Sequence, residues 1–236
     1  MKKFLALIVI LLAILLALLN FVLPGTVAQI LEEQIVNATA AQEVDVILSS
    51  NPNAKVALGE IEKVHATASA ATLGEMNFKN LTLDGEKVSL NITELLIPSK
   101  NLTASERMHK ILKHADQIEL RGTVTEDELR NFIAAKESKL EAPTVKVYPD
   151  EVKASARTKF LGRNVDLDVA GIFTVSNGDV LFHMTRLDSN AILRRVNLDV
   201  LMGDVKILDS SILPLGLRFD AVEMRDGEVI VTAVRR

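Results

Sequence analysis

The amino-acid sequence predicts an α+β fold in which a long, curved antiparallel β-sheet wraps against a few helices. Runs of alternating apolar and polar residues are separated by turn dipeptides at Asp84-Gly85, Asn177-Gly178 and Asp226-Gly227, as in β-hairpins. Strands follow strands without crossover helices between them, which excludes parallel βαβ units.

The N-terminal segment has the composition of a membrane anchor. Lys2 and Lys3 precede an apolar run over residues 4–23 that only Asn20 interrupts. The apolar part of a signal peptide has about 7–15 residues, whereas a membrane-spanning helix needs roughly 20. Pro24-Gly25 then predicts a helix break. We therefore expect residues 1–24 to form a transmembrane helix whose N-terminus is cytoplasmic.

The remaining residues, 25–236, are then expected to form a single extracytoplasmic domain held at the cytoplasmic membrane. Small residues before Ala28 also suit a signal peptidase, and cleavage there would give a secreted protein. The chain has no cysteine, so an apolar core rather than disulfides must stabilise this domain. Its acidic excess and the absence of Trp argue against a nucleic-acid partner.

The first half of the domain predicts one helix followed by several strands. Apolar residues recur at helical spacing over residues 27–41, and period-two alternation follows over residues 44–48, 61–73, 76–83 and 87–96. Asp84-Gly85-Glu86 predicts a hairpin turn between the last two strands. The apolar phase changes between Phe78 and Leu81, which indicates a bulge near Lys79-Asn80.

The second half mixes helices and strands. Helical spacing predicts a helix over residues 105–114, and Thr125 with Glu128 forms the capping-box signature of another. A third short helix is expected over residues 190–202. The expected strands cover residues 117–124, 152–160, 165–175, 180–187, 217–224 and 229–234.

The residues that could carry chemistry form no catalytic or metal-binding pattern. His109 and His114 stand five residues apart, about 140° around a helix, which suits a shared metal poorly. Asp166 and Asp168 alternate with apolar residues, so a solvated sheet face explains them. No nucleophile, phosphate-binding or zinc motif occurs. The sequence therefore predicts a protein that is not an enzyme and that has no cofactor and no metal.

A basic cluster in the helix expected over residues 105–114 and just before it has a possible role at a membrane surface. Its members are Lys100, Arg107, Lys110 and Lys113. Each charge near anionic headgroups would contribute about 1 kcal/mol. Glu106 and Asp116 dilute the cluster, and a solvated helix face is the alternative.

Several short motifs occur in a recognisable order after the N-terminal segment. They are LGEIEKV at 58–64, LTLDG at 81–85, IELRGTVTEDEL at 118–129, VAG at 169–171, LPLGL at 213–217 and DG at 226–227. This order resembles the LmeA-like phospholipid-binding family of bacterial envelope proteins. The resemblance covers most of residues 24–234, and its motifs are structural rather than catalytic.

The resemblance implies a non-enzymatic domain similar to tubular lipid-binding proteins, in which a long curved sheet wraps a helix and encloses acyl chains. Its partners would be phospholipid and the membrane, and its role lipid handling or envelope maintenance at the outer face of the cytoplasmic membrane. The motifs identify no lining residues, so the candidates come from apolar strand faces and one helix: Leu81, Leu83, Val88, Leu90, Ile92, Phe132, Val165, Leu167, Val169, Phe173, Phe182 and Met184.

Two other functions stay open at this point. A structural or interaction module of the envelope would have the same strands around a fully packed core. An envelope hydrolase would need a nucleophile and a base close together, which this sequence does not indicate.

Overall fold

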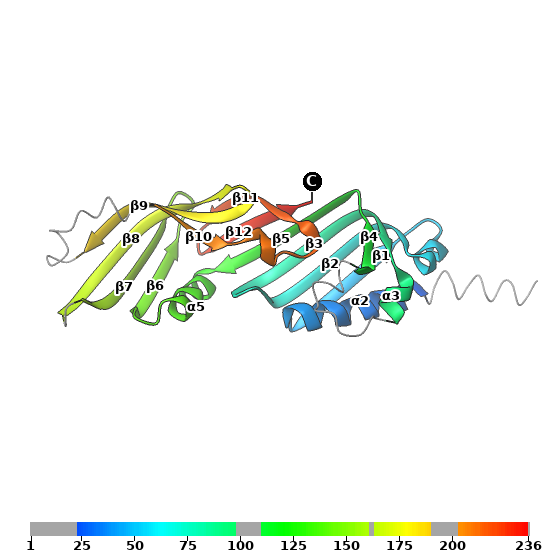
Figure 1. Ribbon diagram of the computed structural model, residues 1–236, viewed down its shortest axis with the longest axis horizontal. Coiled ribbons are helices and arrows are strands. Elements are labelled where there is room, and N and C mark those ends of the chain that lie inside the picture. Colours follow the sequence, from blue (N-terminus) through cyan, green and yellow to red (C-terminus); the bar gives the residue numbers. More distant parts are fainter. Residues whose placement is uncertain (1–22, 98–109, 161–162, 190–202, 236) are drawn as a thin grey trace, which may run out of the picture. The chain divides into compact units, whose positions relative to one another are not determined.

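The computed structural model describes residues 23–97, 110–160, 163–189 and 203–235 (Figure 1). The chain divides into two compact units. The first comprises residues 1–68, 82–119 and 235–236, and the second comprises residues 69–81 and 120–234. The predicted transmembrane helix lies almost entirely outside the described residues.

Hydrogen bonds order the strands into two sheets. The strand order of the first is β1-β2-β3-β5-β12-β11, with β4 paired to β3, and that of the second is β10-β9-β8-β7-β6. The bounds in the first sheet are β1 (Glu43–Ser49), β2 (Glu60–Leu73), β3 (Met76–Leu90), β4 (Leu112–His114), β5 (Gln117–Thr125), β11 (Arg218–Arg225) and β12 (Glu228–Val234). The pairs β3–β4 and β11–β12 and all four pairs of the second sheet are antiparallel. The predicted α+β class is therefore confirmed.

A long helix, α2 (Leu23–Thr39), packs beside β1 in the first unit (Figure 1). It buries Val27, Ala28 and Leu31, which confirms the helical spacing in the sequence. Glu32 fixes the neighbouring strand, because its Oε1 accepts a hydrogen bond from the Val46 N–H at 3.1 Å. Every helix among the described residues is too short or too polar to cross a bilayer.

Pro24 and Gly25, which the sequence analysis treated as helix breakers, are helical and lie in the first turn of α2. Proline is tolerated there because an N–H in the first turn has no partner within the helix.

The hairpin turn predicted at Asp84-Gly85-Glu86 is wrong, because β3 continues through these residues to Leu90. Gly85 is buried in the strand, where a Cβ would come within 3.1 Å of Val88 Cγ2. Its absence of a side chain therefore allows close packing rather than a turn. The turn that ends β2 contains Gly74, whose φ is +61°.

The predicted change in the phase of apolar alternation within β3 is confirmed. Lys79 and Asn80 are both exposed between the buried Phe78 and Leu81. A second change follows at Lys87, whose φ of 48° is unusual for a residue with a side chain.

Two element boundaries near the end of β3 also differ from the prediction. The strand expected to reach residue 96 ends at Leu90, and α3 (Ile92–Leu96) follows. Asn91 caps this helix by accepting the Glu94 N–H at 3.3 Å, a role that the alternation did not indicate. A helix was expected over residues 105–114, and its residues 105–109 lie outside the described residues. Its last part, Leu112–His114, is the strand β4.

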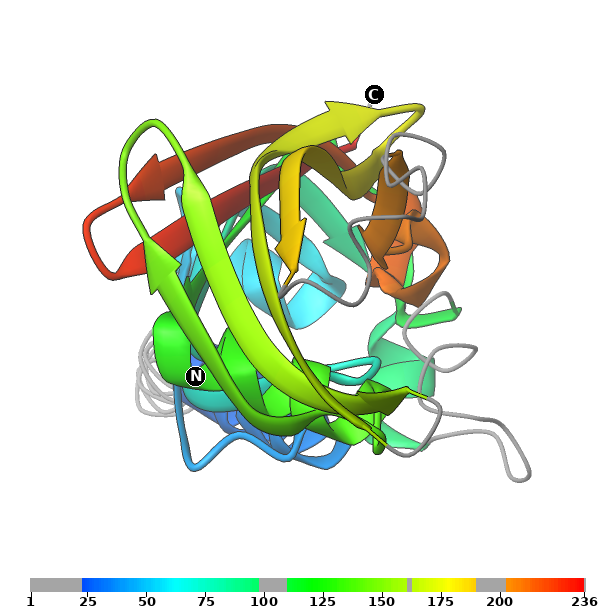
Figure 2. The same cartoon turned by 90° about the vertical axis from the view of Figure 1, so that its left-hand side faces the viewer.

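The second sheet is an antiparallel meander in the second unit. Its strands are β6 (Glu141–Val147), β7 (Val152–Phe160), β8 (Arg163–Ser176), β9 (Asp179–Ser189) and β10 (Asp204–Leu208). The strands predicted in residues 152–187 are therefore confirmed, and Asn177-Gly178 forms the turn with φ values of 55° and 87°. Figure 2 shows that the strands of this sheet bend along their length, as the predicted curvature requires.

The two edge strands of this sheet, β6 and β10, were not predicted from the sequence. Pro143 interrupts the β6 pattern, and its register shifts between Glu141 and Thr144. Proline and bulges are typical of edge strands, where one side of the backbone needs no partner. The helix predicted over residues 190–202 lies outside the described residues.

The helix α5 (Glu126–Lys136) has the predicted capping box and packs against β6. Thr125 Oγ1 accepts the Glu128 N–H at 3.4 Å, and Glu128 Oε2 accepts the Thr125 N–H at 2.7 Å. Glu126 connects the helix to the edge strand, because its Oε1 accepts the Val147 N–H at 2.9 Å. The predicted hairpin around Asp226-Gly227 is also present, between β11 and β12.

Candidate functional site

The five-stranded sheet of the second unit has one apolar face and one charged face. Along β8, Leu167, Val169 and Phe173 alternate with Asp166 and Asp168. Antiparallel pairing places residues of matching character opposite one another on each face. The apolar face continues on β9 with Phe182 opposite Phe173 and Met184 opposite Gly171, and on β7 with Ala154 opposite Val169 and Ala156 opposite Leu167.

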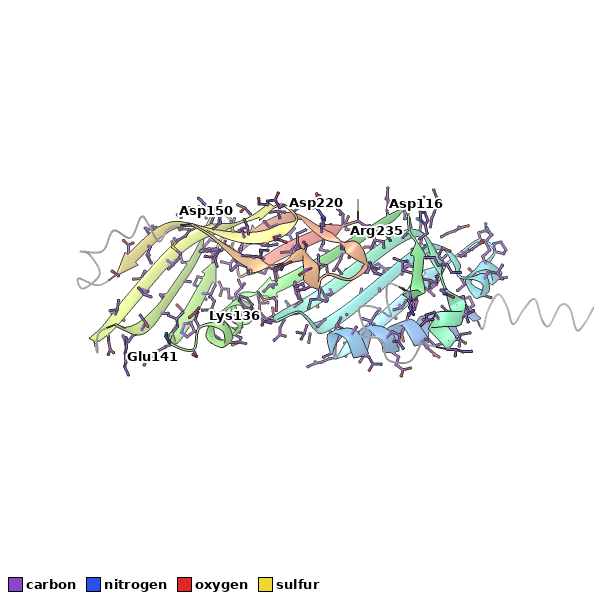
Figure 3. All side chains as sticks on the ribbon, viewed as in Figure 1. Asp116, Lys136, Glu141, Asp150, Asp220 and Arg235 are labelled. Carbon is purple, nitrogen blue, oxygen red and sulfur yellow. The ribbon has the colours of Figure 1, made fainter. Side chains whose placement is uncertain are left out.

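The charged face is solvated and its charges are paired. Arg157 Nε lies 2.9 Å from Asp166 Oδ1, and His183 Nδ1 lies 2.8 Å from Asp204 Oδ1. These side chains are all about half exposed. Figure 3 labels Glu141, which pairs with Lys159 at the start of β6. The solvated sheet face predicted for Asp166 and Asp168 is therefore confirmed, because both residues are exposed.

The apolar face is only partly covered by the rest of the chain. Val147, Val152, Val165 and Val180 are almost completely buried. Between them lie residues that remain partly exposed to solvent: Ala154, Ala156, Leu167, Val169, Phe173, Val175, Phe182, Met184 and Leu187. We call this set the open apolar face. Partly exposed apolar side chains gathered on one face of a sheet are a candidate contact surface for a ligand, a protein or a membrane.

Two aromatic rings cross the middle of the open apolar face. Phe173 and Phe182 pack edge to face, with ring centroids 5.5 Å apart. The Phe182 ring reaches across to Gly171, where a Cβ would lie only 2.6 Å from its Cζ. A register shift in β9 accompanies this packing, and Thr185 Oγ1 donates to the Ala170 carbonyl at 3.2 Å. Such bulges increase the local bend of a sheet.

The structure brings half of the predicted lining residues together. Val165, Leu167, Val169 and Phe173 on β8 share a face with Phe182 and Met184 on β9. Some members of this surface were not predicted from the apolar strand faces of the sequence, chiefly Ala154 and Ala156 on β7. Their alternation was visible in the sequence, but the register that places them beside Val169 and Leu167 was not.

Two further predicted lining residues of the second unit lie outside the five-stranded sheet, on α5 and β3. Phe132 is a partly exposed residue of α5, and Lys136 Nζ lies 5.8 Å from its ring centroid, within reach of a cation–π contact. Leu81 is buried in β3, close to Gly122, with its Cδ2 3.0 Å from where a Cβ would stand. Leu81 therefore fills ordinary core space.

The other four predicted lining residues belong to the first unit. Val88 and Leu90 are buried in β3, and Leu83 is partly exposed in the same strand. Ile92 lies in α3 and not in a strand, which corrects its assignment to a strand face. Its Cγ1 would be 3.2 Å from a Cβ at Gly59.

The predicted membrane-surface cluster is only partly described. Lys110 and Lys113 are exposed, whereas Lys100 and Arg107 lie outside the described residues. Lys113 belongs to the strand β4, whereas a helix was expected at this position.

Two carboxylates of the second unit have pKa values that ion pairs and backbone hydrogen bonds lower. The Lys146 ammonium, and then the Val147 N–H, hold the pKa of Glu126 below its ordinary 4.5. The Ser211 N–H is the main group that lowers the pKa of Asp209 to about 2. Within the described ranges there is no group of three His, Cys, Asp or Glu side chains that could hold a metal.

Comparison with known proteins identifies one family. A model of the LmeA-like phospholipid-binding family matches residues 18–234, which is nearly the whole chain. No curated protein and no solved structure matches the chain.

Proposed function

The chain belongs to the LmeA-like phospholipid-binding family, and we propose that it holds the acyl chains of phospholipid against the open apolar face. The observation that carries this proposal is the partial exposure of Leu167, Val169, Phe173, Phe182 and Met184 on one face of a sheet. Their aliphatic and aromatic atoms match a hydrocarbon ligand. The charged groups of the sheet stand on its other face, where an acyl chain gains nothing.

Binding would be driven by removing apolar surface from water. Each methylene group that moves from water into an apolar site contributes roughly 0.8 kcal/mol. A ligand with two acyl chains therefore gains a large free energy even when only part of each chain contacts protein. The polar headgroup would stay in water or at the rim, because burying it without hydrogen-bond partners is costly.

We further propose that the protein works at the outer face of the cytoplasmic membrane, in lipid handling or envelope maintenance, and does so without catalysis. The apolar run over residues 4–23 after Lys2 and Lys3 supports this location. An anchor would keep the binding unit close to its lipid source, and a tethered site meets its ligand at a raised effective concentration.

Site-specific photo-crosslinking tests the lipid-binding surface in the full-length protein. A photoreactive amino acid is placed at Phe173, on the open apolar face, or at its neighbour Thr174, on the opposite face. Both variants are expressed in cells and irradiated, and crosslinked phospholipid is identified by mass spectrometry. We expect lipid adducts from position 173 and few from position 174.

Equal crosslinking at the two positions would indicate contact with bulk lipid, and no adduct at position 173 in a folded protein would exclude the proposed site. Circular dichroism of the purified variants establishes that they are folded. The second outcome would favour a structural or interaction module, in which a protein covers this face. Accessibility of the C-terminus to external protease in spheroplasts tests the location separately.

A further inference from the structure

Among the described residues of the first unit, four large apolar side chains are more than half exposed: Ile47 in β1, and Leu58, Leu96 and Ile97. The exposed fractions are 74% for Leu58, 55% for Leu96 and 75% for Ile97. Single exposed apolar residues are ordinary on a protein surface. Leu58 ends the short helix η1 (Asn53–Leu58), Leu96 ends α3, and Ile97 follows directly. They therefore come from two chain segments, and their significance depends on whether these segments meet.

Backbone contacts hold the two segments together. The Gly59 carbonyl accepts a hydrogen bond from the Leu90 N–H at 2.7 Å. A Cβ at Gly59 would also lie 3.2 Å from Cγ1 of Ile92, the first residue of α3. Gly59 has φ +82° and caps η1 in the left-handed conformation, so the chain turns here without a side chain in the contact. Leu58 therefore lies close to the start of α3, and the end of this five-residue helix is about 7 Å further along.

A lysine also lies close to the start of α3. The Asn91 N–H, just before α3, donates to the Ile111 carbonyl at 2.7 Å. Lys110 precedes Ile111 in the chain and is exposed. Long basic side chains beside apolar ones are typical of surfaces at the boundary between lipid headgroups and acyl chains, where the ammonium stays with the phosphates.

The position of these residues relative to α2 indicates the partner. The helix η1, which ends in Leu58, packs against α2 in the same unit. Residues 4–23, which immediately precede α2 in the chain, are apolar apart from Asn20. Leu58 therefore ends an element that contacts the helix directly following the apolar segment.

We propose that Leu58, Leu96 and Ile97 form a docking surface that inserts shallowly into the bilayer beside the N-terminal segment. This inference rests on the proposed membrane location of residues 4–23 and adds a second contact with the same membrane. The apolar side chains enter the headgroup region, and Lys110 faces the lipid phosphates. A second contact restricts the rotation of the unit about its anchor, so the unit keeps one orientation relative to the lipid surface.

The absence of Trp from the chain makes the insertion directly measurable. The Ile97→Trp variant has one tryptophan, whose emission reports the polarity around position 97. The full-length variant is reconstituted in vesicles of phosphatidylethanolamine and phosphatidylglycerol. We expect a blue-shifted emission, protection from acrylamide, and strong quenching by lipids brominated close to the headgroup.

The Val36→Trp variant is the matched control. Val36 is also exposed, at 38%, and lies in the same unit near the other end of α2. Thirteen residues of helix separate it from Leu23, which is roughly 20 Å. Its emission should stay that of a water-exposed indole, and brominated lipid should have little effect.

Three outcomes would overturn the proposal. Equal, unquenched emission from the two variants shows that position 97 stays in water although the chain is in the membrane. A blue shift without quenching by brominated lipid shows that a protein, such as a second copy, covers the surface. Failure of the chain to float with the vesicles shows that the membrane location itself is wrong, and the docking surface falls with it. The Leu96→Trp variant provides an independent measurement if the first variant does not fold.

Discussion

The Phe182 ring occupies the space that a side chain at Gly171 would need. A Cβ at Gly171 would lie 2.6 Å from Phe182 Cζ and 2.3 Å from the His183 carbonyl oxygen. The second contact involves backbone, which cannot move without disturbing the β8–β9 pairing. The position therefore requires glycine because of close approach, and its φ lies outside the left-handed region.

We predict that Gly171→Ala lowers the free energy of unfolding by about 1–3 kcal/mol, as overpacking in a well-packed site does. Denaturant unfolding followed by circular dichroism measures the change. Gly203→Ala is the control, because a Cβ there meets no atom within 4 Å, and its effect should stay within about 0.5 kcal/mol. Equal effects of the two substitutions would show that the contact with β9 is relaxed in solution.

A second prediction separates lipid binding from stability on the open apolar face. Leu167 is partly exposed and Val165, two residues earlier on the same face, is fully buried. We expect Leu167→Asn to weaken phospholipid binding about fivefold, which corresponds to about 1 kcal/mol of lost apolar contact, with little loss of stability. Displacement of a fluorescent phospholipid from the purified protein measures the affinity.

The matched change at the buried position should have the opposite profile. Val165→Asn places an amide in the core and should lower the free energy of unfolding by about 1–3 kcal/mol. If Leu167→Asn destabilises the protein as much and leaves the affinity unchanged, Leu167 is a core residue and the proposed face does not contact lipid.

A third prediction concerns the start of α5. Thr125→Ala removes the hydroxyl that accepts the Glu128 N–H. We expect this change to lower the free energy of unfolding by about 1 kcal/mol. Thr125→Ser keeps the hydroxyl and should retain most of the stability. Thermal unfolding of both variants measures the difference. Similar melting temperatures for the two variants would mean that water replaces the cap at no cost.

The sequence predicted the parts of the fold in which a local rule and the tertiary environment agree. The capping box at Thr125 and the turn at Asn177-Gly178 are local, and both are present. The hairpin turn at Gly85 was predicted wrongly because a glycine after an aspartate is typical of a turn. Here it serves close packing inside a long strand, and only the neighbouring Val64 and Val88 reveal this.

The candidate site shows the same limit. Alternation along β8 identified Leu167, Val169 and Phe173 as one face, because the period of a strand is a local property. Their partners Ala154 and Ala156 depend on register, which hairpin geometry and burial determine together. The partial exposure that distinguishes a binding face from a packed core is a property of the folded chain alone, so no sequence pattern could provide it.

The last prediction concerns the acid titration of the turn after β10. Asp209 Oδ1 accepts the Ser211 N–H at 2.9 Å, and its Oδ2 accepts a hydrogen bond from Lys206 Nζ at 3.0 Å. The Ser211 N–H, then the Ser211 side chain and Lys206, lower the pKa of Asp209 from 3.8 to about 2. Because the folded-state pKa is depressed, the ionised carboxylate stabilises the turn above pH 3.8. This stabilisation is lost as the pH falls from about 4 through about 2.

Carbon-detected NMR of the Asp209 carboxyl group between pH 1.5 and 6 measures this titration. In the Lys206→Met variant the midpoint should rise but stay below 3.8, because the Ser211 N–H, the largest cause, is retained. A wild-type midpoint at 3.8 would show that the capping hydrogen bond does not persist in solution. A midpoint that reaches 3.8 only in Lys206→Met would assign the whole shift to the ion pair, and the backbone contact would then contribute nothing to holding this turn.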